Sequence, residues 1–165
     1  MTNLRRCTVG DAAELTRLRA LLHTAMGADP GAEGWARACE DAFARRLAEP
    51  DRFAAFVVEV DGRAVSSGCG WLEEHLPQPG TLDGRRGHLA SMSTEPEHRR
   101  RGHGRTVLVA LMGWFTELGI PRVDLRATED GRALYESFGF RELGGATMAW
   151  TAAGTPPPGL GLAAR

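Results

Sequence analysis

The amino-acid sequence predicts a mixed-sheet α/β (α+β) domain with flanking helices. In the first third of the chain, apolar residues recur at the spacing of amphipathic helices. In the middle, runs of branched and aromatic residues flank Asp61-Gly62, a dipeptide typical of two-residue hairpin turns. Towards the C-terminus, helical and strand patterns alternate, so those strands must be joined by crossovers. The expected element order is β-α-α-β-β-β-α-β-α-β.

Two helices are expected in the N-terminal third, after a first strand at residues 3–8. Asp11 can cap the first helix, because its carboxylate can accept a hydrogen bond from an unpaired amide of the first turn. The segment 25–34 interrupts the helical pattern with glycine and proline. The second helix is expected over about 35–48, with Pro50 beyond its end. The apolar positions are Leu15, Leu18, Leu22 and Met26 in the first helix, and Trp35, Cys39, Phe43 and Leu47 in the second.

The middle of the chain is expected to form three strands. Residues 53–60 and 64–74 are predicted to be the two arms of a hairpin. The following segment, 75–87, is rich in proline and glycine and is expected to be an irregular loop. A further strand is predicted over 88–95, ended by Pro96, which cannot donate to a sheet ladder.

The last third is expected to begin with an amphipathic helix at 104–118, followed by Gly119 as its C-terminal cap. A strand at 122–127, a short helix at 129–138 and a last strand at about 140–150 complete the predicted fold.

The length of 165 residues fits one domain, predicted over 1–154, with a Pro/Gly-rich C-terminal tail at 155–165. No apolar run approaches the ~18 residues of a membrane span. The first residues lack the apolar stretch of a secretory signal. We therefore expect a cytoplasmic protein without membrane contact. The bias towards Arg, Ala and Gly indicates a GC-rich, bacterial genome rather than a function.

The 20 basic and 21 acidic residues give a net charge of −1, which argues against a nucleic-acid binder. All of the basic residues are arginines, and this excludes mechanisms that require a lysine, such as Schiff-base catalysis. Cys7, Cys39 and Cys69 lie far apart and are expected to be buried free thiols. The histidines show no metal-ligand spacing, so no metal site is expected.

The most informative segment is the arginine-glycine turn, residues 99–104, between a predicted strand and a long helix. A helix N-terminus presents unpaired amides and a positive dipole, which favour anions. Gly102 and Gly104 have no Cβ, so a phosphate can approach the backbone closely. The arginines of the turn and Arg105 add guanidinium groups that suit phosphate oxygens. These features predict a phosphate or pyrophosphate site, although a solvated charge run or an RNA-binding patch would have the same composition.

This turn resembles motif A of the GNAT superfamily of acyl-CoA-dependent N-acetyltransferases, whose signature is Gln/Arg-x-x-Gly-x-Gly/Ala. Here the motif reads Arg99-Arg100-Arg101-Gly102-His103-Gly104. The preceding Thr-Glu-Pro and the later ATEDGRALYESFGF, residues 127–140, also resemble family segments. The resemblance covers residues 3–150 and implies a GNAT-like acyl-CoA N-acyltransferase fold.

The resemblance implies that acetyl-CoA inserts between two parallel strands that splay apart. The strand before the turn would offer backbone groups to the pantetheine and the acetyl carbonyl, and the amides of the turn would hold the pyrophosphate. Thr128 stands where many family members have an asparagine that contacts the cofactor. The cofactor-binding residues implied are Met92, Ser93, Thr94, Arg99, Arg100, Arg101, Gly102, His103, Gly104, Arg105, Thr106 and Thr128.

Two catalytic residues are implied by position. Tyr135 matches the family tyrosine that faces the sulfur of coenzyme A, where a phenol can protonate the leaving thiolate. His88 stands where other members have a glutamate base, and its imidazole suits proton transfer near neutral pH. Val123 occupies a second position at which some members carry a basic glutamate, and it cannot act. The alternatives are a core tyrosine at 135 and a packed histidine at 88.

The acceptor side is predicted from charge and from the resemblance. Glu73 and Glu74 could bind a cationic amine, and Glu59 is a further carboxylate within reach of the sheet. Trp35 belongs to a stretch, 23–35, that would cover the acceptor site in this fold.

The predicted reaction is acetyl transfer from acetyl-CoA to a primary amine of a small molecule or peptide, by direct attack within a ternary complex. An acyl-CoA-binding sensor with little turnover is the first alternative, and a nucleic-acid binder that uses residues 99–105 is the second. A homodimer through the last strands is possible by analogy.

Overall fold

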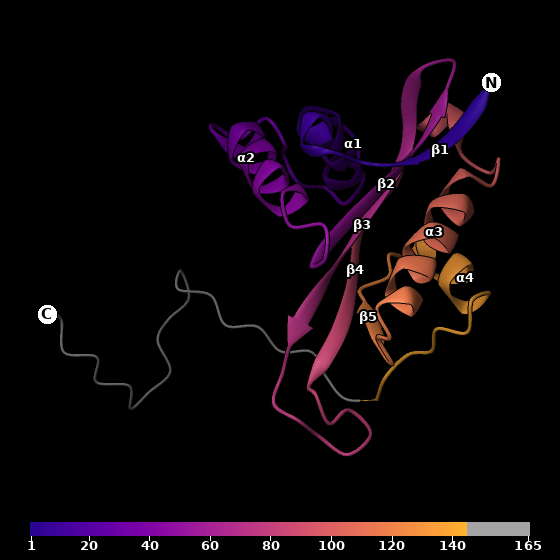
Figure 1. Cartoon of the computed structure of the whole chain (residues 1–165). Helices are drawn as coiled ribbons and strands as arrows, with labels where there is room; N and C mark the ends of the chain where they lie inside the picture. Colours follow the sequence, from indigo (N-terminus) through magenta and orange to yellow (C-terminus); the bar gives the residue numbers. More distant parts are fainter. Residues whose placement is uncertain (145–165) are drawn as a thin grey trace, which may run out of the picture. The chain divides into compact units, whose positions relative to one another are not determined.

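The computed structural model describes residues 1–144, which form two compact units, Met1–Glu129 and a second that begins at Asp130. The first unit contains a five-stranded sheet with the spatial order β1-β2-β3-β4-β5 (Figure 1). Neighbouring strands are antiparallel except for the parallel pair β4 and β5. The predicted mixed sheet is therefore confirmed, while the single domain over 1–154 stays a prediction. The strands are β1 (Thr2–Arg6), β2 (Phe53–Val60), β3 (Arg63–Glu74), β4 (Arg85–Thr94) and β5 (Val123–Leu125).

Helices flank both faces of the sheet. Helices α1 and α2 lie on one face and α3 lies on the other (Figure 1). The hairpin between β2 and β3 turns at Asp61 and Gly62, both of which adopt positive φ, as a type I′ turn requires. The helical segments are η1 (Val9–Asp11), α1 (Ala12–Ala25), α2 (Trp35–Leu47), η2 (Pro96–His98), α3 (His103–Glu117) and α4 (Glu129–Glu136).

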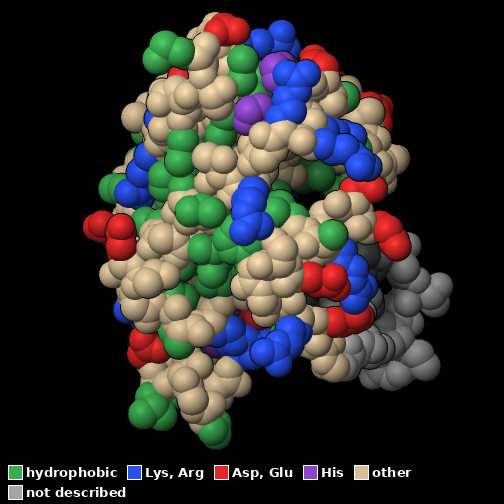
Figure 2. Space-filling model, turned by 90° about the vertical axis from the view of Figure 1, so that its right-hand side faces the viewer, with side chains coloured by type: hydrophobic (Ala, Val, Ile, Leu, Met, Phe, Trp, Pro, Cys, Tyr) green, Lys and Arg blue, Asp and Glu red, His purple; other side chains and the backbone are tan. Residues whose placement is uncertain are grey.

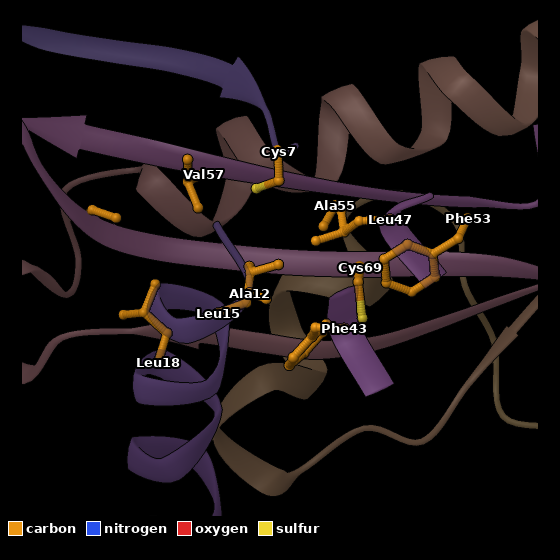
Figure 3. Close-up of a cluster of buried hydrophobic side chains, with 11 residues drawn as sticks. Cys7, Ala12, Leu15, Leu18, Phe43, Leu47, Phe53, Ala55, Val57 and Cys69 are labelled. Atoms are coloured by element: carbon orange, nitrogen blue, oxygen red, sulfur yellow. The ribbon is translucent and has the colours of Figure 1, made fainter. Parts of the chain in front are cut away.

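One hydrophobic cluster fills the space between the sheet and helices α1 and α2 (Figure 3). Leu15 and Leu18 of α1 and Phe43 of α2 meet strand residues there, as their helical spacing predicts. Cys7 and Cys69 are buried in the same cluster as free thiols. Burial raises the pKa of each thiol to about 12, so both are protonated at neutral pH.

The opposite face of the sheet packs against α3. The ring of Phe115 lies against Gly70 of β3 and Gly87 of β4, where an added Cβ would stand 2.6 Å from a ring carbon. Two adjacent strands without side chains at this point thus provide the flat surface on which the ring rests. Burying such a ring contributes about 1.5–3 kcal/mol. Val107, Leu108 and Leu111 complete the buried face of the helix.

The predicted capping hydrogen bond of Asp11 to the first helix is wrong. Asp11 occupies the N-cap position of α1, but its side chain makes no cap hydrogen bond to that helix in the described chain. Its carboxylate accepts hydrogen bonds from the Arg5 guanidinium at 2.7 and 2.9 Å and from the Thr8 amide at 2.8 Å. The hydrogen bonds from Arg5 lower the pKa of Asp11. The residue therefore fastens β1 to the start of α1, since a guanidinium from the strand competes successfully for the carboxylate.

Three of the predicted strands differ most from the observed ones. Strand β4 begins at Arg85 rather than 88, because Arg85, Arg86 and Gly87 pair with the end of β3. Strand β5 is shorter than predicted, at Val123–Leu125. Residues 140–144 of the predicted last strand adopt no strand conformation, and residues 145–150 and the predicted tail at 155–165 lie outside the described residues.

Candidate active site

Strand β5 is the edge strand of the described sheet and is much shorter than its neighbour β4. Within the described residues, the parallel pairing runs from Gly87–Val123 to Leu89–Leu125. Strand β4 continues for five residues, to Thr94, beyond the end of this pairing. Because β5 ends at Leu125, the edge of β4 that faces it has no strand partner within residues 1–144 over the part that contains Met92, Ser93 and Thr94.

A bulge bends β4 at the start of this part. Ser67 of β3 pairs with Ser93 and Cys69 pairs with Ala90, so Ser91 and Met92 together stand opposite Gly68. Ser91 adopts φ +57°, and its hydroxyl accepts a 2.7 Å hydrogen bond from Arg19 of α1.

The Met92 side chain covers the space that a Cβ at Gly68 would occupy: the Met92 sulfur lies 2.2 Å from that position. The bulge thus packs the Met92 side chain between the sheet and α3, and it turns the backbone of residues 91–94 relative to the rest of the strand.

Glu95 anchors the end of β4. Its carboxylate is only 3% exposed and accepts hydrogen bonds from Arg17 of α1 at 2.6 Å and from Arg63 of β3 at 2.7 Å. Its amide donates to the Val65 carbonyl at 2.8 Å. Burial acts to raise the pKa of Glu95, but the two guanidinium groups outweigh it, so the pKa lies below its ordinary value. Sequence analysis did not assign this role, although Glu95 is the acid of the Thr-Glu-Pro segment.

The arginine-glycine turn follows η2 and leads into α3. Gly102 is the N-cap residue with φ +84°, a conformation that disfavours any residue with a Cβ. In the described chain no side chain caps the first amides of α3. Arg99, Arg100 and Arg101 are exposed beside them. Arginine and histidine side chains gather at the upper end of the face in Figure 2. The structure thus brings exposed arginines and an uncapped helix N-terminus together, as predicted for an anion site.

His103 differs from its arginine neighbours in the turn. Its ring is 9% exposed and lies 6.1 Å from the ring of His98. Burial lowers the pKa of His103, and the charges of His98 and Arg101 lower it further. His103 is therefore neutral at pH 7, and what it presents to an anion is its backbone amide. Thr106, one turn further along α3, is exposed, and its hydroxyl donates to the Gly102 carbonyl at 3.2 Å.

His88 lies at the centre of a polar cluster on the α1–α2 face of the sheet. It pairs with Trp71 of β3 on one side and with Asp124 of β5 on the other. Its ring stacks on Trp71 with centroids 4.5 Å apart, and its Nδ1 lies 3.5 Å from Glu73 Oε1. Within the described residues, Leu89, the next residue, is the last of β4 that pairs with β5.

Glu73 and Glu74 have different partners. Glu73 accepts a hydrogen bond from Trp71 Nε1 at 3.2 Å and pairs with His75 Nε2 at 3.1 Å. Glu74 forms an exposed ion pair with Arg52 at 2.9 Å. The structure therefore brings Glu73 to His88, whereas Glu74 is tied to the start of β2.

A hollow of about 770 Å³ lies beside this cluster, between the end of α2 and the strands β2 and β3. This volume lies in the range of small-molecule sites. The third candidate carboxylate, that of Glu59 on β2, accepts a 2.7 Å hydrogen bond from Arg5 Nε of β1. Residues that line the hollow include Arg45, Arg46, Phe53, Trp71, Glu73 and Glu74.

Trp35 is not a lining residue of this hollow. It starts α2, and its ring meets the edge of His23 of α1 at 5.6 Å. This ring contact joins the two ends of the connection between α1 and α2, residues 26–34. The connection lies within the stretch 23–35 that is predicted to cover the acceptor.

Tyr135 belongs to α4 and lies in the second unit. Its side chain is 8% exposed and meets the ring of Phe140 at 5.9 Å in an edge-on contact. Burial raises the pKa of Tyr135 to about 12, so the phenol is protonated at neutral pH. Thr128 is exposed and directly precedes α4.

The part of the chain that the structure describes contains no group of His, Cys, Asp and Glu side chains able to hold a metal ion. Among the same residues, no helix is both long and apolar enough to cross a membrane.

Comparison with known proteins agrees with this geometry. The family model of the acetyltransferase (GNAT) family matches residues 15–140. An uncharacterized N-acetyltransferase, YsnE of Bacillus subtilis (strain 168), is 36% identical over 80 residues, which are 46% of this chain. The match spans about half (48%) of that relative's length.

Solved structures share the fold. A GCN5-related N-acetyltransferase from Ralstonia eutropha JMP134 is 26% identical with a TM-score of 0.83, and the match covers 93% of this chain and 100% of that one. A predicted acetyltransferase with acetyl-CoA from Clostridium acetobutylicum is 22% identical with a TM-score of 0.83, covering 90% and 96% of the two chains. With a family match over residues 15–140 and the sheet and turn described above, this chain belongs to the acetyltransferase (GNAT) family, as its motifs predicted.

Proposed function

We propose that this protein transfers the acetyl group of acetyl-CoA to a primary amine of a small molecule or peptide, by direct attack within a ternary complex. The observation that carries the proposal is the edge of β4 that continues beyond Leu89, where β5 ends at Leu125, combined with the uncapped start of α3. Membership of the acetyltransferase family supports the same reaction.

The residues of the turn fit a pyrophosphate. The amides at the start of α3 are the positive end of a 15-residue helix. A Cβ built on Gly102 would meet no described atom within 4 Å, so there is open space beside the turn. Arg99, Arg100 and Arg101 supply exposed guanidinium groups, and their charge complements two phosphates. The backbone of Met92, Ser93 and Thr94 would hold the pantetheine and the acetyl carbonyl along the edge of β4 beyond Leu89.

When bound, acetyl-CoA supplies a thioester carbonyl that an amine can attack. Backbone amides beyond the bulge of β4 would stabilise the negative charge that develops on the carbonyl oxygen, the largest electrostatic contribution to acyl transfer. Tyr135 would donate its phenolic proton to the departing sulfur. A phenol with a pKa of about 12 is fully protonated at neutral pH, which suits a donor.

His88 would accept the proton that the acceptor ammonium must lose before it can attack. Glu73 is the carboxylate beside it, with 3.5 Å between Glu73 Oε1 and His88 Nδ1. The stack on Trp71 fixes the plane of the ring. These contacts support His88 as the base and Glu73 as its partner on the acceptor side.

Direct attack is favoured over a covalent acetyl-enzyme by the state of the thiols. A cysteine nucleophile acts as the thiolate. Burial raises the pKa of Cys7 and of Cys69 to about 12, so at neutral pH both are thiols rather than thiolates.

The first experiment measures acetyl-CoA binding by calorimetry and acetyl transfer by release of free thiol with a panel of amines. Gly104→Trp places an indole over the turn and should abolish binding. Gly113→Trp is the matched control, because Gly113 is exposed on the same helix with open space around its Cα. Binding without turnover across the panel would favour the acyl-CoA sensor, and absence of binding by the native protein would contradict the proposal.

A further inference from the structure

Among the described residues, no acidic side chain forms an ion pair with one guanidinium of the hollow, that of Arg46. Arg46 of α2 stacks over the ring of Trp71, with its Cζ 5.0 Å from the ring centroid, and also approaches Phe53 at 5.9 Å. Stacking of this kind engages the face of the guanidinium and leaves its N–H donors in the plane available. All three residues line the hollow.

Three carboxylates line the hollow: Glu73 and Glu74, which have basic partners, and Glu49. Arg52 binds Glu74 at 2.9 Å, and Glu73 binds His75 at 3.1 Å. Within residues 1–144, neither Arg45 nor Arg46 lies within the 4.0 Å of a carboxylate that defines an ion pair. The hollow therefore presents the exposed guanidinium of Arg46 on an aromatic floor, with the Glu49 carboxylate also among its lining residues.

Trp71 connects this charge to the proposed base. Its ring stacks on His88 at 4.5 Å and is also the surface on which Arg46 rests. Its Nε1 donates to Glu73, the carboxylate 3.5 Å from His88. A compact molecule in the hollow can thus present an anionic end to Arg46 and a cationic end to Glu73, whose Oε1 lies 3.5 Å from His88 Nδ1.

We propose that the acceptor is a small amine that also carries an oxyanion, a carboxylate or a phosphate, which Arg46 binds in this hollow with help from Arg45. The proposal rests on the proposed function and adds the substrate class. The guanidinium fork matches the two oxygens of either anion, and its place on the two rings reduces the freedom lost on binding. The amine end of the same molecule faces Glu73, which would hold the ammonium until His88 removes a proton.

The test compares matched acceptors in acetyl-transfer assays. Straight-chain ω-amino carboxylates of increasing length are paired with their primary amides, and ω-aminoalkyl phosphates with the corresponding amino alcohols. The wild-type protein should acetylate the acidic member of each pair with a higher kcat/KM than the neutral member. The series with the larger acidic-to-neutral ratio of kcat/KM shows whether the preferred anion is a carboxylate or a phosphate.

Variants assign the effect to the residue. Arg46→Gln should raise KM for the acidic acceptors by about tenfold or more and leave KM for the neutral ones unchanged, because it removes a charge-assisted hydrogen bond. Arg46→Lys should restore part of the affinity by keeping the charge. Arg37→Gln is the matched control, since Arg37 is exposed on the same helix outside the hollow.

Calorimetry of the acidic amines in the presence of coenzyme A gives a readout that does not depend on turnover. Binding that Arg46→Gln weakens supports the proposal even if no amine is acetylated, in which case only the enzymatic function fails. Equal kcat/KM for acidic and neutral acceptors, or equal losses for both in Arg46→Gln, would overturn the proposal while leaving the acetyltransferase function in place.

Discussion

Arg17 Nη1 of α1 donates to Glu95 Oε1 at 2.6 Å, although the two residues are 78 positions apart. Because Glu95 is the residue at which β4 passes into η2 and the arginine-glycine turn, the ion pair ties the proposed cofactor site to the first helix. Arg63 of β3 binds the same oxygen at 2.7 Å. Glu95 follows β4 directly, and its buried carboxylate binds guanidinium groups from α1 and β3. These contacts position the turn.

Glu95→Gln should lower the free energy of unfolding by about 3 kcal/mol, because it leaves two guanidinium groups without the buried carboxylate they share. Urea unfolding followed by circular dichroism measures the change. Glu14→Gln is the control: Glu14 also binds Arg17, but its side chain is 37% exposed, so its loss should cost less than 1 kcal/mol, on the order of a surface ion pair.

The effect of Glu95 should depend on pH. Its pKa in the folded protein lies below the ordinary value of about 4.3, so the carboxylate contributes stability above that value and loses it as the pH falls through the folded-state pKa. The difference in unfolding free energy between wild type and Glu95→Gln should therefore narrow below about pH 4. A difference that stays constant from neutral to acidic pH would show that the ion pairs do not stabilise the fold.

Tyr135→Phe should reduce kcat by about a hundredfold and leave the Kd of acetyl-CoA unchanged, because only the proton donor is removed. The phenyl ring keeps the edge-on contact with Phe140, so the melting temperature should change little. Steady-state kinetics with calorimetry separates the two constants. Unchanged kcat at saturating substrates would exclude Tyr135 as the general acid and leave it as a packed tyrosine.

His88→Ala should lower kcat/KM and remove the acid limb of its pH profile, since it removes the proposed proton acceptor. His75→Ala is the matched control: His75 also contacts Glu73, but it lies beyond the end of β3. The control should keep the acid limb. If the profile of His88→Ala retains its shape, the role of His88 is limited to its stack on Trp71.

Gly87→Ala should destabilise the first unit by about 1–3 kcal/mol, because the new methyl group would stand 2.6 Å from the Phe115 ring. Gly113→Ala, in open space within α3, should be neutral or stabilising, since alanine favours helix. Phe115→Leu should recover part of the loss in a double variant. An equal loss for Gly87→Ala with and without Phe115→Leu would show that the two positions do not couple.

The family and the general order of elements could be predicted because their signals are local. Helical spacing located α1, α2 and α3, and Asp61-Gly62 located the hairpin, since both depend on residues that are near in sequence. The arginine-glycine turn was recognisable because its glycines and arginines are contiguous. The proposed roles of Tyr135 and His88 come from the same kind of local match and remain predictions.

The sequence by itself determined which segments are helices and strands and which motif the turn carries. Only the tertiary structure decided that β4 starts at Arg85, that Asp11 binds Arg5, and that Arg17 and Arg63 share Glu95. It also brought both His88 and Arg46 to the ring of Trp71. The physical reason is that local conformation follows from backbone preference and apolar spacing, whereas a charged side chain takes its partner from whichever distant segment the packed sheet brings within reach.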